Sequence, residues 1–108
     1  MLSVICPIYN EEKYIAQFLE SLLKQDYPKG DLEILLIDGM SKDKTREIVL
    51  EYINRYPFIR IIDNPDKIVP CAMNKGIEAA KGDIIMRLDA HASYQSDYFS
   101  VLVNGIKR

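Results

Sequence analysis

Short apolar runs alternate with amphipathic segments along this chain, and this alternation constrains its fold more than any other feature. The apolar runs have the length of β-strands and cover residues 2–5, 33–37, 58–62 and 83–88. Apolar residues recur at helical spacing in residues 10–25, 41–55 and 70–80, and again after Asp97. A β-α-β-α order predicts parallel strands joined by right-handed crossovers. We therefore expect an α/β fold with the parallel sheet order 3-2-1-4 and helices on both faces.

Polar residues mark where the expected helices begin. Asn10 can cap the first helix, and Ser41 or Asp43 can cap the second. The nearby basic residues are expected to form a solvated face: Lys42, Lys44 and Arg46. On the last helix, one apolar face is expected to contain Phe99, Leu102, Val103 and Ile106.

Composition limits the classes of protein to consider. The 108 residues predict one domain, residues 1–108, and the net charge of −2 disfavours nucleic acid as a partner. No apolar run reaches the ~18 residues of a membrane span, and the first residues predict a strand, not a signal peptide. The two cysteines, Cys6 and Cys71, do not form a C-x-x-C motif. Reduced thiols in a cytoplasmic protein are the expected state.

Reactive side chains follow the ends of three expected strands. Pro7, Tyr9 and Glu11 follow the first strand, Asp38 follows the second, and Asp89 and His91 follow the fourth. In open α/β sheets, ligands bind in the crevice beyond the carboxyl ends of the strands. Carboxylates, an imidazole and helix N-termini in that crevice suit a nucleoside diphosphate and a divalent cation.

The order and spacing of these motifs resemble those of a known family. The segments are VICPIYNEE at residues 4–12, IDGMSKDKT at 37–45, NKGIEAAKGD at 74–83 and RLDAH at 87–91. They resemble the inverting family 2 glycosyltransferases, whose fold is the Rossmann-like GT-A type. The pairing of Asp-Gly-Met-Ser with Asp-Ala-His is similar to the branch that builds bacterial exopolysaccharides of the succinoglycan type. The chain resembles the nucleotide-sugar-binding N-terminal part of such an enzyme.

The resemblance implies roles for individual residues. Pro7, Tyr9 and Glu11 would line the nucleotide pocket, and Asp38 would face the uracil or ribose of a UDP-sugar. Asp89 would bind the sugar diphosphate and, with His91, a divalent cation, Mn²⁺ or Mg²⁺. The acceptor would be a glycan or a lipid-linked sugar in cell-surface polysaccharide synthesis. Residues that depart from the family pattern are Gly39, Met73 and His91, which stand where Asp, Arg and Asp are usual.

Each residue also has a simpler interpretation. Asp38 could cap a turn, and Glu11 could only complement a helix dipole. The family's catalytic base lies downstream of the metal motif, so it is expected beyond Arg108. A non-enzymatic nucleotide-binding module is therefore an alternative. A dinucleotide-binding domain is disfavoured because no G-x-G-x-x-G follows the first strand.

An exposed apolar surface is expected on the last helix and the outer side of the fourth strand. Such surfaces favour association, so a homodimer through this edge is expected. Peripheral association of the full-length protein with the inner face of the membrane is a further expectation.

Overall fold

The computed structural model describes residues 1–90, 92 and 94–107. His91, expected to be a metal ligand, lies outside the described residues. Within the described part, the strands form one parallel sheet in the order β3-β2-β1-β4, as expected. The strands are β1 (Leu2–Ile8), β2 (Leu32–Asp38), β3 (Ile59–Asp63) and β4 (Ile84–Arg87). The helices are α1 (Ile15–Leu23), α2 (Thr45–Arg55), α3 (Val69–Ala79) and α4 (Tyr98–Lys107), with a 3₁₀ turn at Lys29–Asp31.

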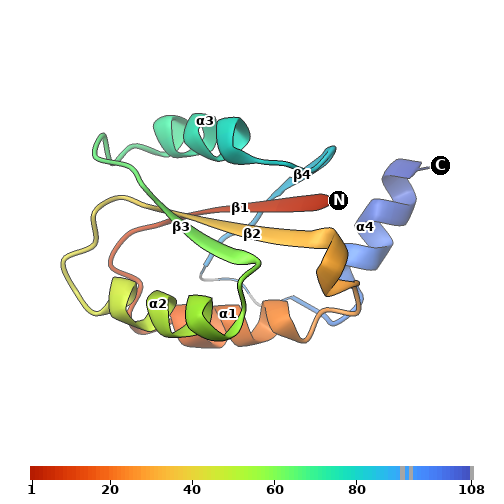
Figure 1. The fold of residues 1–108 in the computed structure, drawn as a ribbon, viewed down its shortest axis with the longest axis horizontal. Coiled ribbons are helices and arrows are strands. Elements are labelled where there is room, and N and C mark those ends of the chain that lie inside the picture. The colour runs from red at the N-terminus through yellow and green to blue at the C-terminus, as the bar shows by residue number, and fades with distance from the viewer. Residues whose placement is uncertain (91, 93, 108) are drawn as a thin grey trace.

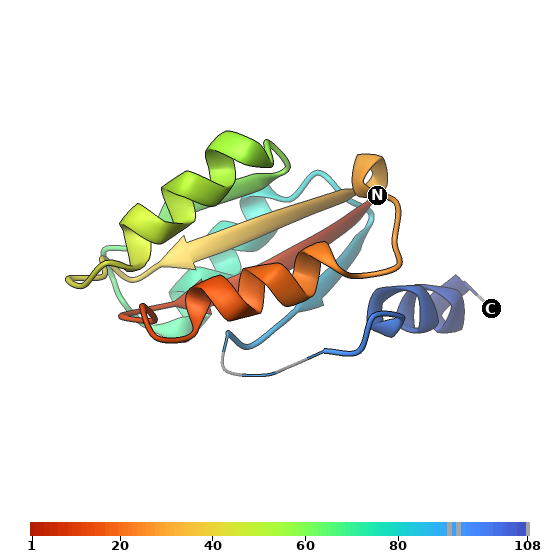
Figure 2. The same ribbon diagram turned by 90° about the horizontal axis from the view of Figure 1, so that it is seen from below.

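Helices cover both faces of the sheet, which confirms the expected layering. Figure 1 shows α3 on one face and α1 and α2 on the other. Figure 2 shows α4 beside the end of the sheet where the strands begin, away from their carboxyl ends. The loops that follow the strands therefore share the opposite end of the molecule with the N-termini of α1, α2 and α3.

The sheet separates two parts of the core, because successive strand residues point to opposite faces. On the larger side, Val4 and Leu36 pack with Phe18 of α1 and Val49 of α2. On the smaller side, strand residues pack against Ala72 of α3, namely Ile5, Leu35 and Ile37. Every residue of β2 is buried, which explains its continuous apolar run. This double-sided burial holds the carboxyl ends of β1 and β2 rigidly.

Asn10 does not cap α1, contrary to expectation. The helix begins at Ile15, and Asn10 adopts a left-handed conformation with φ of 50°. Its side-chain oxygen accepts a hydrogen bond from the Lys42 N–H (2.8 Å), and its own N–H donates to the Ser41 hydroxyl (2.8 Å). Asparagine suits both a helix cap and a left-handed turn. Here it joins the loop after β1 to the loop after β2.

The last helix buries only part of its expected face. Phe99 and Val103 are buried, whereas Leu102 and Ile106 are exposed. The helix is attached to the end of α1 through Gln25, whose Oε1 accepts the Phe99 N–H (3.0 Å) and whose Nε2 donates to the Gln95 carbonyl (2.6 Å). This attachment turns part of the apolar face away from the core.

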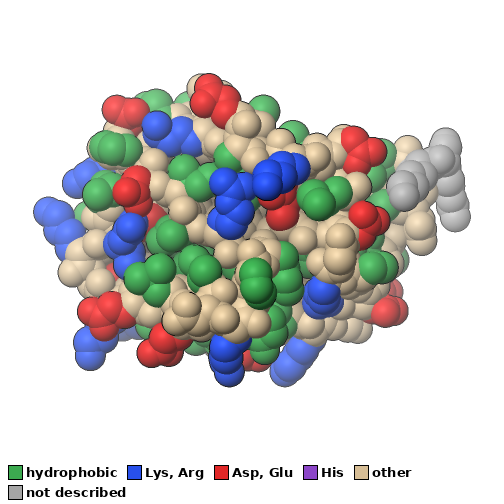
Figure 3. Space-filling view, viewed as in Figure 1, with side chains coloured by type: hydrophobic (Ala, Val, Ile, Leu, Met, Phe, Trp, Pro, Cys, Tyr) green, Lys and Arg blue, Asp and Glu red, His purple; other side chains and the backbone are tan. Residues whose placement is uncertain are grey.

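The surface combines apolar and charged side chains. On the face drawn in Figure 3, acidic and basic side chains are interspersed among hydrophobic ones. The apolar residues exposed on α4 and β4 are Val101, Leu102, Ile106 and Ile85. In the part of the chain that the structure describes, no helix combines the length and the apolar character needed to cross a membrane.

Candidate functional site

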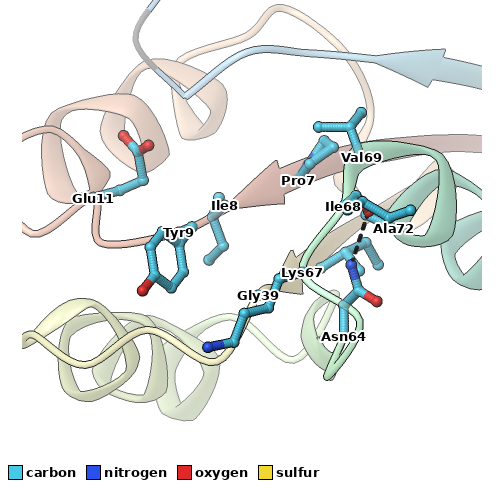
Figure 4. Close-up of a pocket in the computed structure, with 11 residues that line it drawn as sticks. Pro7, Ile8, Tyr9, Glu11, Gly39, Asn64, Lys67, Ile68, Val69 and Ala72 are labelled. Carbon is cyan, nitrogen blue, oxygen red and sulfur yellow. Dashed lines mark hydrogen bonds between the residues drawn. The ribbon is translucent and has the colours of Figure 1, made fainter.

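A cavity of about 200 Å³ lies at the carboxyl ends of β1 and β2. The end of β1, the end of β2 and the segment joining β3 to α3 form its walls (Figure 4). The lining residues are Pro7, Ile8, Tyr9, Glu11, Ile37, Gly39, Asn64, Lys67, Ile68, Val69 and Ala72. Among the expected site residues, Pro7, Tyr9 and Glu11 are thus brought together. The cavity occupies the crevice that the strand order predicts.

Tyr9 gives the cavity an open aromatic surface. Its side chain is 43% exposed, and the Lys67 ammonium lies 5.9 Å from the ring centroid. A Cβ atom added at Gly39 would lie 3.4 Å from Tyr9 Cδ1. Because Gly39 has no side chain, the edge of the tyrosine ring stays open on that side. A partly exposed ring of this kind can stack on a planar base.

Glu11 reaches the cavity from a tightly bonded turn. Its N–H donates to Thr45 Oγ1 (2.7 Å), and its carbonyl accepts the N–H groups of Tyr14 and Ile15. The side chain is buried. Because α1 starts four residues later, Glu11 lies outside the first helical turn. Its position on the cavity wall is compatible with ligand binding.

Asp38 lies behind the cavity wall and does not face the open space. Its side chain is 0% exposed. Oδ1 accepts the Ser41 N–H (3.1 Å) and hydroxyl (2.5 Å), and Oδ2 accepts Arg46 Nη1 (2.7 Å). Ile37 and Gly39, the two chain neighbours of Asp38, line the cavity. A ligand would contact them before it reached this carboxylate.

Arg46 is not part of a solvated face, and that expectation is wrong. Nη1 also donates to Asp63 Oδ1 (2.8 Å) at the end of β3. The hydrogen bond to Asp38 and the further contact with Asp63 raise the pKa of the Arg46 guanidinium above its ordinary value. Asp38 is therefore a buried ion-paired carboxylate, which explains how a charge is accommodated after four buried aliphatic residues.

The start of α2 is joined to the loop after β1. Asp43 Oδ1 accepts the Thr45 N–H (2.9 Å) and hydroxyl (2.5 Å), and Oδ2 accepts the Glu12 N–H (3.3 Å). Desolvation raises the pKa of Asp43, but these hydrogen bonds outweigh it and hold the pKa below its ordinary value. The N-cap residue of α2 is Lys44, so neither expected candidate, Ser41 or Asp43, is the N-cap, although the Asp43 carboxylate accepts the N–H of the first helical residue, Thr45. The Ser41 hydroxyl is directed to Asp38 instead.

Asp89 is exposed beyond β4 and is not among the residues that line the cavity. Its N–H donates to the Tyr94 hydroxyl oxygen (3.0 Å). Among the described residues, no group of three or more His, Cys, Asp or Glu side chains could hold a metal ion. An exposed carboxylate nevertheless fits a hard cation, because Mg²⁺ is typically held by one or two carboxylates together with substrate phosphates.

The site also contains a residue that sequence reasoning missed. Asn64 is 2% exposed; its N–H donates to the Asp38 carbonyl (2.7 Å) and its Nδ2 to the Ile68 carbonyl (3.1 Å). None of the sequence motifs described above includes Asn64. The rule that loops after parallel strands line the crevice would have pointed to Asn64 and Lys67 as well.

The two cysteines differ in environment. Cys6 is fully buried in β1, and burial raises the pKa of its thiol well above its ordinary value. Cys71 lies half-buried in the first turn of α3, next to Ala72 of the cavity wall. Both are free thiols, as expected.

Comparison with known proteins identifies related sequences. The model of the family described as "Glycosyl transferase family 2" matches residues 3–108. A Methanococcus voltae dolichyl N-acetyl-alpha-D-glucosaminyl phosphate 3-beta-D-2,3-diacetamido-2,3-dideoxy-beta-D-glucuronosyltransferase is 41% identical over 99 residues, covering 90% of this chain and 31% of the relative. The probable glycosyltransferase YdaM of Bacillus subtilis is 34% identical, covering 97% of this chain and 26% of the relative.

Solved structures share the fold. S. aureus TarS 1-349 in complex with UDP has a TM-score of 0.84 and 28% identity, covering 98% of this chain and 32% of that one. Mannosyltransferase PcManGT from Pyrobaculum calidifontis, in complex with GDP-Man and Mn²⁺, has a TM-score of 0.85 and 28% identity, covering 98% and 31%. The chain spans about a third of the length of these structures, and the expected GT-A type of α/β fold is confirmed.

Proposed function

Because this chain belongs to glycosyl transferase family 2, we propose that it binds the donor of a sugar-transfer reaction, a UDP-sugar. The observation that carries the proposal is the cavity at the carboxyl ends of β1 and β2, with the exposed Tyr9 ring on its wall. TarS, whose fold is similar, has been solved with UDP and with UDP-GlcNAc. A cavity of about 200 Å³ is smaller than the ~300–1,000 Å³ of sites that enclose a whole drug-sized ligand. We assign it to the base and ribose alone.

The cavity residues would bind and orient the nucleotide. Tyr9 would stack on the base, Pro7 would form the apolar floor, and Glu11 would accept hydrogen bonds from ribose hydroxyl groups. Asp38 would act on the base or ribose indirectly. It lies behind the wall and would hold the segment at Gly39 in place against the nucleotide. Holding the donor in one orientation lowers the entropic cost of the transfer step. We assign no general base among the described residues.

Asp89, together with His91, would hold a divalent cation at the diphosphate. Imidazole and carboxylate are both competent ligands for Mn²⁺. The chemistry supplied by a cation held there would be neutralisation of the negative charge that develops on the diphosphate as the bond to the sugar breaks. PcManGT has been solved with Mn²⁺ and GDP-Man, and Asp89 lies two residues beyond the end of β4, the strand that pairs with β1.

The acceptor is proposed to be a glycan or a lipid-linked sugar in cell-surface polysaccharide synthesis. Support comes from the motifs similar to the succinoglycan-type branch of inverting enzymes. The Methanococcus relative is named as acting on a dolichyl-linked sugar phosphate, and TarS is named as a poly(ribitol-phosphate) glycosyltransferase. A cytoplasmic location, at the inner face of the membrane, would suit such an acceptor.

The donor site can be tested by calorimetric titration of UDP with and without Mn²⁺. We expect Mn²⁺ to strengthen binding, because Asp89 and the diphosphate repel each other unless a cation lies between them. Asp89→Asn should abolish most of this gain, and His91→Ala should reduce it. Asp38→Ala should weaken UDP binding roughly tenfold in either condition, because the wall at Gly39 loses the carboxylate that holds Ser41 and Arg46 behind it, about the free energy of one hydrogen bond to a charged group.

The control is Asp97→Asn, which removes an exposed carboxylate at the other end of the sheet and should change neither value. An unchanged UDP affinity on adding Mn²⁺ would contradict the metal assignment. If UDP did not bind with Mn²⁺ or without it, the donor assignment itself would be contradicted.

A further inference from the structure

One arginine joins the ends of two strands at the back of the cavity. Arg46, from the first turn of α2, donates from Nη1 to Asp38 Oδ2 (2.7 Å) and to Asp63 Oδ1 (2.8 Å). Asp38 and Asp63 are register partners at the ends of β2 and β3. Two neighbouring carboxylates repel each other, so the guanidinium between them converts a repulsion into a bridge. A nitrogen with two hydrogens suits this geometry because it can serve both acids.

The bridge lies directly before the segments that line the cavity. Gly39 follows Asp38, and Asn64 follows Asp63; both line the cavity. The Asn64 N–H donates to the Asp38 carbonyl (2.7 Å). A Cβ atom at Gly39 would lie 3.7 Å from the Lys67 Cα. The loop after β2 and the loop after β3 therefore form one continuous wall, whose base is fixed by the bridge.

The loop that carries Tyr9 is attached to the same wall. The Ser41 hydroxyl donates to Asp38 and accepts the Asn10 N–H (2.8 Å). A chain of hydrogen bonds thus extends from Asn10 through Ser41 and Asp38 to Arg46. The buried half of the bridge lies at Asp38, which is 0% exposed, whereas the Asp63 side chain is 54% exposed.

We propose that Arg46 is a positioning residue of the donor cavity: by binding Asp38 and Asp63 at once, it fixes the wall formed by Gly39, Asn64 and Lys67 relative to Tyr9. Arg46 does not line the cavity and would not touch the nucleotide. The inference deepens the proposed function and rests on it for the identity of the ligand. The bridge itself is testable without any ligand.

The test uses Asp63→Ala, which cuts the exposed half of the bridge and leaves Arg46 paired with the buried Asp38. Replacing Arg46 by an apolar residue is unsuitable, because a buried unpaired carboxylate can destabilise the fold severely. The matched control is Asp66→Ala, which removes the same charge from an exposed acid of the same loop. Arg46→Lys is the second variant, since lysine keeps the charge but not the planar fork of donors.

The first measurement is amide hydrogen exchange by NMR on the ligand-free protein. If the bridge positions the wall, Asp63→Ala should speed exchange of the Ser41 and Asn64 N–H groups several-fold. Arg46→Lys should do so to a smaller extent. Two control quantities should stay at the wild-type values. One is exchange of the Leu88 N–H, which donates to the Ile5 carbonyl (3.1 Å) on the far side of the sheet. The other is the urea midpoint of unfolding. Unchanged exchange at Ser41 and Asn64 would overturn the proposal, whether or not UDP binds.

The second measurement is the dissociation constant for UDP in the presence of Mn²⁺. Relative to Asp66→Ala, we expect Asp63→Ala to weaken UDP binding about three- to tenfold, with Arg46→Lys in between. Equal affinities in the two alanine variants would show that loss of charge explains the effect, and would overturn the proposal. If the wild-type protein binds no UDP while the exchange result holds, the donor assignment fails and the bridge stands.

Discussion

At Gly76, α3 packs tightly against β1. A Cβ atom added there would lie 2.5 Å from Ile5 Cγ2 and 3.0 Å from Ile5 Cδ1, and Ile5 is fully buried. Glycine is the residue that permits this contact between the helix and the strand. The distance matters for the site because α3 supplies Ala72 to the cavity wall.

We expect Gly76→Ala to lower the free energy of unfolding by roughly 1–2 kcal/mol, because the overpacking cost exceeds the gain in helix propensity. Urea denaturation would measure the change. The matched control is Gly105→Ala in α4, where a Cβ atom meets nothing within 4 Å. That variant should be neutral or stabilising by up to about 1 kcal/mol. A Gly76→Ala protein as stable as the wild type would contradict the close packing of α3 on β1.

Individual site residues were predictable to the extent that strand ends locate them. Pro7, Tyr9 and Glu11 line the cavity, because the alternation of elements fixes which loops meet, and their roles toward a nucleotide stay predictions. The ion pair between Asp38 and Arg46 was not predictable, since a pattern of residues does not say which of several nearby basic side chains turns inward. The expected roles of Asp89 and His91 stay predictions.

At the scale of elements, the strands and helices could be recognised in the sequence because their buried residues form apolar patterns. Their ends could not be predicted, because contacts between residues distant in sequence determine them. The expected strand at residues 33–37 corresponds closely to β2, Leu32–Asp38. α1 begins at Ile15 and not, as expected, directly after Asn10, because Asn10 forms hydrogen bonds with Ser41 and Lys42, about thirty residues away. A local capping rule cannot anticipate partners on another loop.

A buried carboxylate also fastens the opposite end of the sheet. Glu33, near the start of β2, accepts the Ser3 hydroxyl (2.6 Å) and the Lys81 N–H (2.5 Å), and Arg60 lies 3.7 Å away. Desolvation raises the pKa of Glu33, but the hydrogen bonds outweigh it and hold the pKa below its ordinary value. This cluster attaches the segment before β4 to β1 and β2.

Glu33 should therefore contribute stability that depends on pH. Because its pKa is lower in the folded state, the contribution is complete above the unfolded-state pKa of about 4.5 and is lost as the pH falls through the folded-state value. Glu33→Gln should lower the free energy of unfolding at neutral pH and flatten its decline below about pH 4.5. Denaturation at a series of pH values would measure both effects. A control, Glu47→Gln on the exposed side of α2, should leave the pH dependence as in the wild type.

At the scale of the whole molecule, general rules of chain connection predicted the sheet order 3-2-1-4, which is confirmed. The placement of α4 was less predictable, because it depends on Gln25 hydrogen bonds to Gln95 and Phe99. Those contacts leave Leu102 and Ile106 exposed, in agreement with the apolar surface expected on the last helix.

The exposed apolar side chains of α4 predict association at high concentration. Val101, Leu102 and Ile106 are 59%, 38% and 63% exposed, and exposed apolar surface favours contact between molecules. Sedimentation should show an average mass that rises with protein concentration, and Ile106→Ser should reduce the rise. Leu50→Ser, at an apolar residue of α2 that is 50% exposed, is the control and should have a smaller effect. A strict monomer at all concentrations would contradict the prediction.

The unequal environments of the two cysteines give the protein a built-in position for chemical labelling. Thiol reagents attack the thiolate at an accessible sulfur, and Cys6 is fully buried with a raised pKa. Cys71 is therefore the thiol that a maleimide dye can reach, and it lies next to Ala72 of the cavity wall. A fluorophore attached there would report what enters the cavity in the unmutated chain.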